Sequence, residues 1–165
     1  MAVTWHKHEG CGFVVLNNPP VNAINHDVRE GLINAAKWAE REELERVILS
    51  GEGRGFAAGA DTKEFDRPAV APHLPDVINH IEASTIPWIA AIHGAALGGG
   101  GELALGCRYR IARADATIGF PEVILGLVPG AGATQRLPRL IGLTEALKLI
   151  PTGKPFLAEQ LWPLD

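Results

Sequence analysis

Residues 92–107 read IHGAALGGGGELALGC, and we expect the rest of the chain to be arranged around this stretch. Four consecutive glycines, Gly98–Gly101, offer no side chain to a core and lose more backbone entropy on folding than other residues. Glu102 and an apolar run follow, which places the glycines in the first turn of a helix. The unpaired N–H groups of such a turn favour negative charge and suit a developing oxyanion. A tight junction in which glycine only relieves crowding is the alternative interpretation.

The composition is typical of one compact domain spanning residues 1–165. The chain has 165 residues, of which 47% are hydrophobic, and this is enough for a substantial core. A net charge of −4 gives no basic field, which argues against nucleic acid as the main partner. No apolar run reaches signal or membrane-span length, so we expect no membrane partner and a soluble, cytoplasmic protein.

The potential metal ligands and cysteines form no recognisable motif. Cys11 and Cys107 stand alone, and we interpret both as reduced, small apolar residues. His6 and His8 could chelate a metal in isolation, but no third ligand is apparent. We therefore expect no metal site and place both histidines at the surface.

The order of the elements predicts an α/β fold. Strands are expected at residues 12–16, 47–49, 88–92, 109–111 and 116–118. The 88–92 run is continuously apolar, as in a strand buried on both faces. Helices are expected from Asn25 or Asp27, with Arg29 on the polar face, from Asp76 to the Ile86-Pro87 pair, and over 143–150 after a Thr144 cap, while Pro138 is tolerated near a boundary. Strand, strand, helix units recur at intervals of roughly fifty residues, which indicates repeated turns.

Two further segments are similar in kind to the glycine turn. FAAGADTK, residues 56–63, is a glycine-bearing turn that runs into the polar start of a helix. LGLVPGAGATQRLPRLIG, residues 125–142, is another passage from loop to helix, and it follows the turn formed by Phe120, Pro121 and Glu122.

Together these motifs resemble the crotonase superfamily, and within it the enoyl-CoA hydratases. The likeness runs from about Asn17 to Ile150, with three motifs in the right order and spacing. HGAALGGGGELALGCRYRIA is most similar to the hydratase region of bifunctional hydratase and 3-hydroxyacyl-CoA dehydrogenase proteins. The resemblance implies a crotonase-like spiral of ββα units, an acyl-CoA substrate and a homo-oligomer of the trimer type. It implies no separate cofactor, because coenzyme A is part of the substrate.

The same resemblance assigns the site residues. The oxyanion hole falls on the backbone N–H groups of Ala60 and Gly99. Catalytic carboxylates fall on Glu102, expected to activate water, and Glu122, expected to deliver a proton; a concerted addition would use the same pair. The substrate-binding residues are Ala58, Ala60, Asp61, Thr62, Lys63 and Gly99. Removing one oxyanion donor typically lowers the rate about 100- to 1,000-fold.

Each candidate also has a purely structural interpretation. Glu102 could cap the glycine turn, Glu122 could be an exposed loop residue, and Asp61 more often caps the following helix. Lys63 lies near the nucleotide end of coenzyme A or is merely solvated. We expect His93 to be a buried, hydrogen-bonded histidine. The remaining set is expected to back the Glu122 loop as a packing motif at a helix start: Gly130, Ala131, Gly132 and Gln135.

Hydration of trans-2-enoyl-CoA to 3-hydroxyacyl-CoA is therefore the expected activity, a hydro-lyase step of fatty acid β-oxidation. An enoyl-CoA isomerase and a non-catalytic acyl-CoA-binding fragment are the alternatives. A phosphate-binding P-loop fails, because no Gly-Lys-Ser/Thr follows Gly101 and Glu102 would repel phosphate.

The end of the chain departs from the family pattern. The family continues with helices that cover the acyl pocket, whereas this chain stops at Asp165, and Pro163 would break a helix there. We expect an exposed apolar surface near residues 143–164 that favours self-association.

Overall fold

The computed structural model describes residues 1–64, 66 and 68–161. Its strands are β1 Val3–His8, β2 Cys11–Leu16, β3 Arg46–Gly51, β4 Trp88–Ile92, β5 Ala95–Leu97, β6 Tyr109–Ala112, β7 Thr117–Gly119 and β8 Phe156–Leu157. The α-helices are α1 His26–Arg41, α2 Leu74–Ala83, α3 Gly99–Gly106, α4 Ala133–Ile141 and α5 Leu143–Leu149. Short 3-10 helices follow at η1 Thr62–Glu64, η2 Pro121–Leu125, η3 Ile150–Thr152 and η4 Ala158–Leu161. The predicted α/β class is confirmed.

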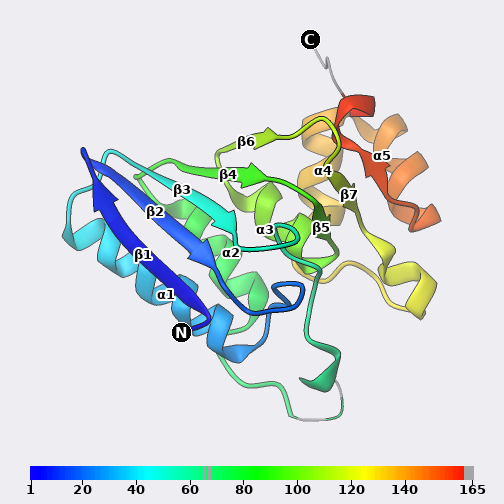
Figure 1. Ribbon diagram of the computed structural model, residues 1–165. Coiled ribbons are helices and arrows are strands. Elements are labelled where there is room, and N and C mark those ends of the chain that lie inside the picture. Colours follow the sequence, from blue (N-terminus) through cyan, green and yellow to red (C-terminus); the bar gives the residue numbers. More distant parts are fainter. Residues whose placement is uncertain (65, 67, 162–165) are drawn as a thin grey trace.

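Four turns of a spiral relate these elements. A five-stranded sheet has the order β1-β2-β3-β4-β6, in which β2, β3, β4 and β6 pair in parallel. After each parallel strand the chain crosses to a second layer, made by the bridges Ile24 to Ala60 and Ala57 to Ala96 and by the β5-β7-β8 sheet. It then enters a helix and returns (Figure 1). The crotonase-like spiral of ββα units is thus confirmed.

The expected spacing of the units was wrong. The parallel strands begin at Cys11, Arg46, Trp88 and Tyr109, which are 35, 42 and 21 residues apart. The helices and loops differ in length from one unit to the next, so the strands do not recur at a fixed interval. The edge strand β1, which carries polar side chains and pairs antiparallel with β2, was not expected from the sequence.

One face of the large sheet forms the core with the helices. Val14, Leu49 and Ala90 lie side by side in register, and all three are fully buried. β4 was predicted to be buried on both faces, but its pattern alternates, since Ile89 and Ala91 are only half-buried. Its continuous apolar sequence therefore reflects an outer face of intermediate exposure.

Helix starts agree with the sequence in part. Asn25 caps α1, because its side-chain oxygen accepts a hydrogen bond of 3.0 Å from the N–H of Val28. Thr144 is not a cap: it lies inside α5, and the residue before that helix is Gly142 at φ +82°. Pro138 lies within α4 rather than near its boundary.

The glycines of α3 allow a close approach between two chain segments. A Cβ at Gly100 would overlap the carbonyl oxygen of Ala57 and lie 2.7 Å from its carbonyl carbon. A Cβ at Gly106 would overlap the side chain of Ile78 in α2. Side chains at these positions would therefore push α3 away from both its neighbours.

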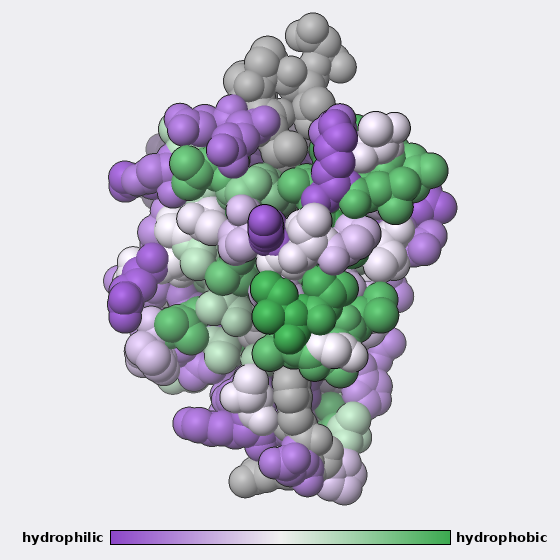
Figure 2. Space-filling view, turned by 90° about the vertical axis from the view of Figure 1, so that its right-hand side faces the viewer, coloured by the Kyte–Doolittle hydropathy of each residue, from purple (hydrophilic) through white to green (hydrophobic). Residues whose placement is uncertain are grey.

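Exposed apolar side chains gather on the side that carries the last helices (Figure 2). The expected surface near residues 143–164 is confirmed where the structure describes it, with Leu143, Leu147 and Leu157 at 63%, 59% and 37% exposure. Pro163 and the end of the expected surface lie outside the described residues. The exposed set also includes Ile124, Leu125, Leu127, Val128 and Leu140.

None of the helices in the described part of the chain has the length and apolar character that a membrane crossing requires.

The close approach at Gly100 generates a stability prediction. Gly100→Ala adds a methyl group against the Ala57 backbone, which cannot rotate away as a side chain could. Alanine normally favours a helix interior by about 1 kcal/mol, but overpacking costs typically about 1–3 kcal/mol. We expect the free energy of unfolding, measured by urea denaturation, to fall by about 2 kcal/mol.

Gly130→Ala is the matched control. The nearest atom to a Cβ at Gly130 is 3.9 Å away, so its free energy of unfolding should change by less than about 0.5 kcal/mol. A Gly100→Ala protein as stable as this control would contradict the packing argument.

Candidate active site

The two predicted backbone donors lie next to each other. Gly98 has φ +52° and precedes α3, whose first residue is Gly99. A Cβ at Gly99 would lie 3.7 Å from the Ala60 nitrogen, and one at Gly59 would lie 3.8 Å from the Gly99 nitrogen. Within the described residues, neither the Ala60 nor the Gly99 N–H donates to a protein acceptor. Two adjacent free donors of this kind can bind one oxygen atom.

Glu122 lies beside this pair of donors. It is the second residue of η2, and its Oε1 would lie 2.8 Å from a Cβ at Gly98. Its Oε2 is buried and has no hydrogen-bond partner among the described groups. Burial raises the pKa of Glu122, and the charge of Glu102 raises it further, although a backbone hydrogen bond opposes the shift. The protonated form of Glu122 is therefore more favoured than in a solvent-exposed glutamate.

Backbone groups at the start of α4 hold the Glu102 side chain. It lies in the first turn of α3, and only 3% of its surface is exposed. Its Oε1 accepts hydrogen bonds from the N–H groups of Ala131 at 2.8 Å and Ala133 at 3.0 Å. Burial raises its pKa, while these two N–H groups and the charge of Arg136 act in the opposite direction. The two carboxyl groups thus interact electrostatically although they are 20 residues apart in sequence.

The loop at the start of α4 has a contact with Glu102 that was not expected. Gly130, Ala131, Gly132 and Gln135 were predicted to back the Glu122 loop. The N–H of Ala131 donates to Glu102, a contact that the sequence did not predict, while the packing behind the Glu122 loop stays a prediction. Backbone donors leave no mark in a sequence, since any residue but proline supplies one.

The predicted substrate-binding stretch forms an accessible turn beside the donors. Ala58 and Asp61 are half-buried, while Ala60, Thr62 and Lys63 are exposed. Asp61 caps η1, as its structural interpretation predicted, because its Oδ1 accepts a hydrogen bond of 3.0 Å from the N–H of Lys63. Lys63 is exposed, and its expected contact with a nucleotide stays a prediction.

Arg29 anchors this turn, although the sequence placed it on a solvated helix face. It is 8% exposed and forms an ion pair of 2.7 Å with Glu64, and its guanidinium also donates to the carbonyls of Pro72 and Val70. Burial alone would raise the pKa of Glu64, but hydrogen bonds from Arg29 and from the His26 N–H hold it below its usual value. These contacts of Arg29 connect the segment after Lys63 to the start of α1.

The remaining candidates have structural roles. His93 is half-buried rather than buried, and its Nε2 lies 3.2 Å from the Gly53 carbonyl oxygen. His6 and His8 are exposed, as expected. In the described part of the chain, no three potential ligands cluster in a metal site.

Both cysteines are free thiols. Cys107 ends α3, where its Sγ lies 3.5 Å from the Leu103 carbonyl oxygen. Burial raises the pKa of this thiol to about 12. Arg110 contacts the same helix end, donating to the carbonyl oxygen of Cys107 at 2.6 Å.

A ββα spiral that places the half-buried Glu122 beside two free backbone donors, and close enough to the buried Glu102 to interact with it electrostatically, defines a protein of the crotonase type. The sequence model of the family described as "Enoyl-CoA hydratase/isomerase" matches residues 6–162, and the chain belongs to this family.

Relatives of two kinds are similar to this chain. The peroxisomal bifunctional enzyme of Danio rerio is 47% identical over 148 residues, which cover 89% of this chain and 21% of that protein. A probable enoyl-CoA hydratase of Bacillus subtilis is 45% identical over 150 residues, covering 86% of this chain and 58% of the relative. The chain therefore spans less than two thirds of the length of either relative.

Solved structures agree with the fold. The enoyl-CoA hydratase from Bacillus anthracis superimposes with a TM-score of 0.90 at 36% identity, covering 97% of this chain and 66% of that one. DspI from Pseudomonas aeruginosa superimposes with a TM-score of 0.90 at 32% identity, over 96% of this chain and 68% of that one.

The raised pKa of Glu102 generates a second prediction. A carboxyl group whose pKa is higher in the folded than in the unfolded state loses a proton less readily in the folded state. The native state therefore loses stability as the pH rises from the pKa of the unfolded state, near 4.5, through the pKa of the folded state. Glu102→Gln mimics the neutral form and avoids this loss. We expect its Tm to equal or exceed that of the wild type at pH 7.5.

The two Tm values should converge in acid, where the wild-type carboxyl group is also neutral; calorimetry across this range tests the sign. A Glu102→Gln protein that is much less stable only at neutral pH would mean that the site stabilises the ionised carboxylate.

Proposed function

We propose that this chain catalyses the hydration of trans-2-enoyl-CoA to 3-hydroxyacyl-CoA. The single observation that carries the proposal is that Glu122, which interacts electrostatically with Glu102, lies beside the turn that supplies the free N–H groups of Ala60 and Gly99. The names of the relatives support the substrate class, since the Bacillus subtilis relative is named as a probable enoyl-CoA hydratase. Because the chain spans only part of those relatives, its activity is a proposal for the residues described.

Binding polarises the substrate. The thioester oxygen accepts hydrogen bonds from the N–H groups of Ala60 and Gly99, which draws electron density away from Cβ. The same donors stabilise the enolate oxygen that forms as water adds, and they need no reorientation during the reaction. The pantetheine and nucleotide lie along the turn from Ala58 to Lys63, and coenzyme A enters as part of the substrate.

The two carboxyl groups divide the proton transfers. The ionised Glu102 takes a proton from a water molecule. As it does so, the water oxygen bonds to Cβ and the double-bond electrons move toward the thioester oxygen. Glu122, protonated, then gives its proton to Cα, so the elements of one water molecule are added. One proton must pass from Glu102 back to Glu122 before the next turnover. The opposite protonation states that this requires are favoured by burial and mutual repulsion.

Two alternatives remain open to test. An isomerase would move the double bond of a 3-enoyl-CoA, and product analysis with that substrate separates it from a hydratase. A non-catalytic acyl-CoA-binding role would give thermal stabilisation by the ligand without any product. We propose a homo-oligomer, for which the exposed apolar side chains of α5 offer a contact surface. The cytoplasmic location stays a prediction, since several relatives are named as peroxisomal.

Loss of either carboxyl group should abolish most of the activity. We expect Glu102→Gln and Glu122→Gln each to lower kcat by about 100- to 10,000-fold, the usual contribution of general acid or base catalysis. The assay follows the ultraviolet absorbance of the conjugated thioester of a short trans-2-enoyl-CoA. Glu30→Gln, an exposed carboxylate on α1, is the control and should keep wild-type kcat. Full activity in Glu122→Gln would overturn the mechanism.

The pH dependence should have two limbs. Activity is expected to fall in acid as Glu102 gains a proton, and in alkali as Glu122 loses the proton it must donate. Because burial raises the pKa of both groups, the two limbs should lie above the usual range of a glutamate. A kcat/KM profile that stays flat in alkali, until the protein unfolds, would remove the acid role of Glu122.

A further inference from the structure

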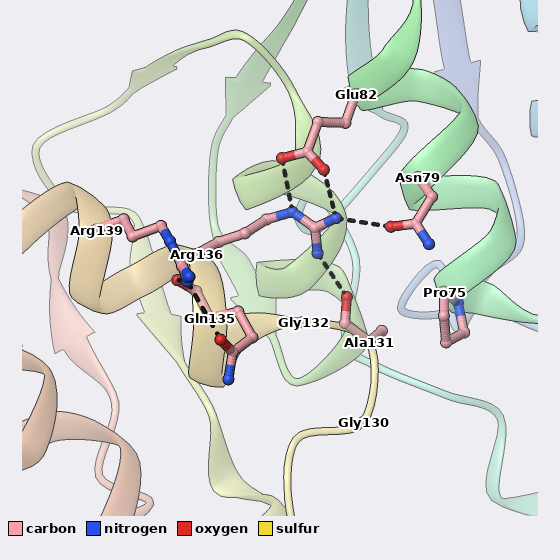
Figure 3. Close-up of a pocket in the computed structure, with 9 residues that line it drawn as sticks. All are labelled: Pro75, Asn79, Glu82, Gly130, Ala131, Gly132, Gln135, Arg136 and Arg139. Atoms are coloured by element: carbon pink, nitrogen blue, oxygen red, sulfur yellow. Dashed lines mark hydrogen bonds and ion pairs between the residues drawn. The ribbon is translucent and has the colours of Figure 1, made fainter.

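Arg136 connects α4 to α2 beside the loop that holds Glu102. Its Nε and Nη2 donate to the carboxylate of Glu82 at 3.0 and 2.7 Å, and Nη2 also donates to Asn79 at 2.9 Å. Its Nη1 donates to the carbonyl oxygen of Ala131 at 2.9 Å (Figure 3). The Arg136 side chain is 13% exposed, against 52% for Glu82. These contacts border a cavity of about 490 Å³.

The contact with Ala131 is relevant to the site. Ala131 donates its N–H to Glu102 and accepts from Arg136 at its carbonyl oxygen, so both of its backbone polar groups are fixed. The next residue, Gly132, has φ +109°, and a Cβ there would overlap Nη1 of Arg136. Only glycine both adopts this backbone conformation readily and leaves room for the guanidinium.

We infer that Arg136 is a positioning residue for Glu102: it fixes the 130–133 loop so that two N–H groups meet one carboxylate oxygen. The charge of Arg136 also acts to lower the pKa of Glu102. The inference rests on the proposed function for its catalytic meaning, because Glu102 must be ionised to activate water. Its structural part concerns this chain alone and can be tested without substrate.

The other charged groups around Glu102 do not replace this effect. The charge of Glu102 raises the pKa of Glu122, so the two carboxyl groups repel each other when both are ionised. The hydrogen bonds from Arg136 hold the pKa of Glu82 below its usual value, but that carboxylate is half-exposed and so better screened by water. The elements packed on α3 also carry Asp76 and His80 on α2, Arg139 on α4 and Arg110 on β6.

The test is a titration of Glu102 by NMR in protein carrying ¹³C-labelled glutamate, with the signal assigned by its absence in Glu102→Gln. Arg136→Met removes the charge and the donor while keeping an apolar stem in place. We expect the midpoint of the Glu102 titration to move to higher pH. The acidic limb of kcat/KM should move with it, and kcat/KM on that limb should fall about 10- to 100-fold.

Arg139→Met is the matched control. Arg139 lies one turn further along α4, and its guanidinium donates only to Gln135 of the same helix among the described residues. This control should leave the Glu102 midpoint unchanged. Arg136→Gln, which keeps a donor for the Ala131 carbonyl but no charge, provides the same test if Arg136→Met does not fold.

The outcomes separate the inference from the proposed function. A Glu102 midpoint that stays at its wild-type pH, or falls, in the folded Arg136 variants would overturn the positioning role, even if their Tm decreased. If the Glu102 midpoint moves to higher pH in the Arg136 variants as expected, but the wild-type protein does not hydrate enoyl-CoA, the proposed function alone is overturned.

Discussion

The absence of side chains where the Gly98–Gly101 turn meets residues 57–60 is the constraint on which the structure depends. Any Cβ at Gly100 would occupy the place of the Ala57 carbonyl, and one at Gly98 would crowd the carboxylate of Glu122. Because this contact is made by bare backbone, two N–H groups from different turns of the spiral can face the same point. The parallel strands and their crossovers bring the two segments together, and the glycines allow them to touch.

Around this contact the protein balances burial against compensating charge. Glu102 and Glu122 are both drawn toward their neutral forms by desolvation, which by itself would leave no base. The start of α4 opposes this for Glu102 only, through two N–H groups and, further away, the guanidinium of Arg136. The two glutamates therefore have different electrostatic surroundings, which is the condition that different proton-transfer roles require. The α2 helix takes part indirectly, since Glu82 and Asn79 hold the guanidinium.

Sequence patterns could predict the features that depend on local periodicity and on glycine. The capped start of α1, the glycine turn of α3 and the positions of β2, β3, β4, β6 and β7 all follow from such signals. The donors to Glu102 were missed because main-chain amides have no residue code, and Arg29 was misplaced because its ion-pair partner lies 35 residues away. The contact between Ala131 and Glu102 was missed for a similar reason: the sequence does not show in which direction a loop faces. The outer face of β4 was misjudged because apolar residues also occupy half-covered positions.

Cys107 gives the molecule a built-in reporter. Its thiol ends the same helix whose first turn supplies the Gly99 donor, it is buried, and its pKa of about 12 leaves almost no reactive thiolate at neutral pH. A small thiol reagent can therefore modify it only in those moments when this end of α3 opens to solvent. The rate of that modification would measure how often the helix loosens, and protection by a ligand would show how strongly an occupied site holds it shut.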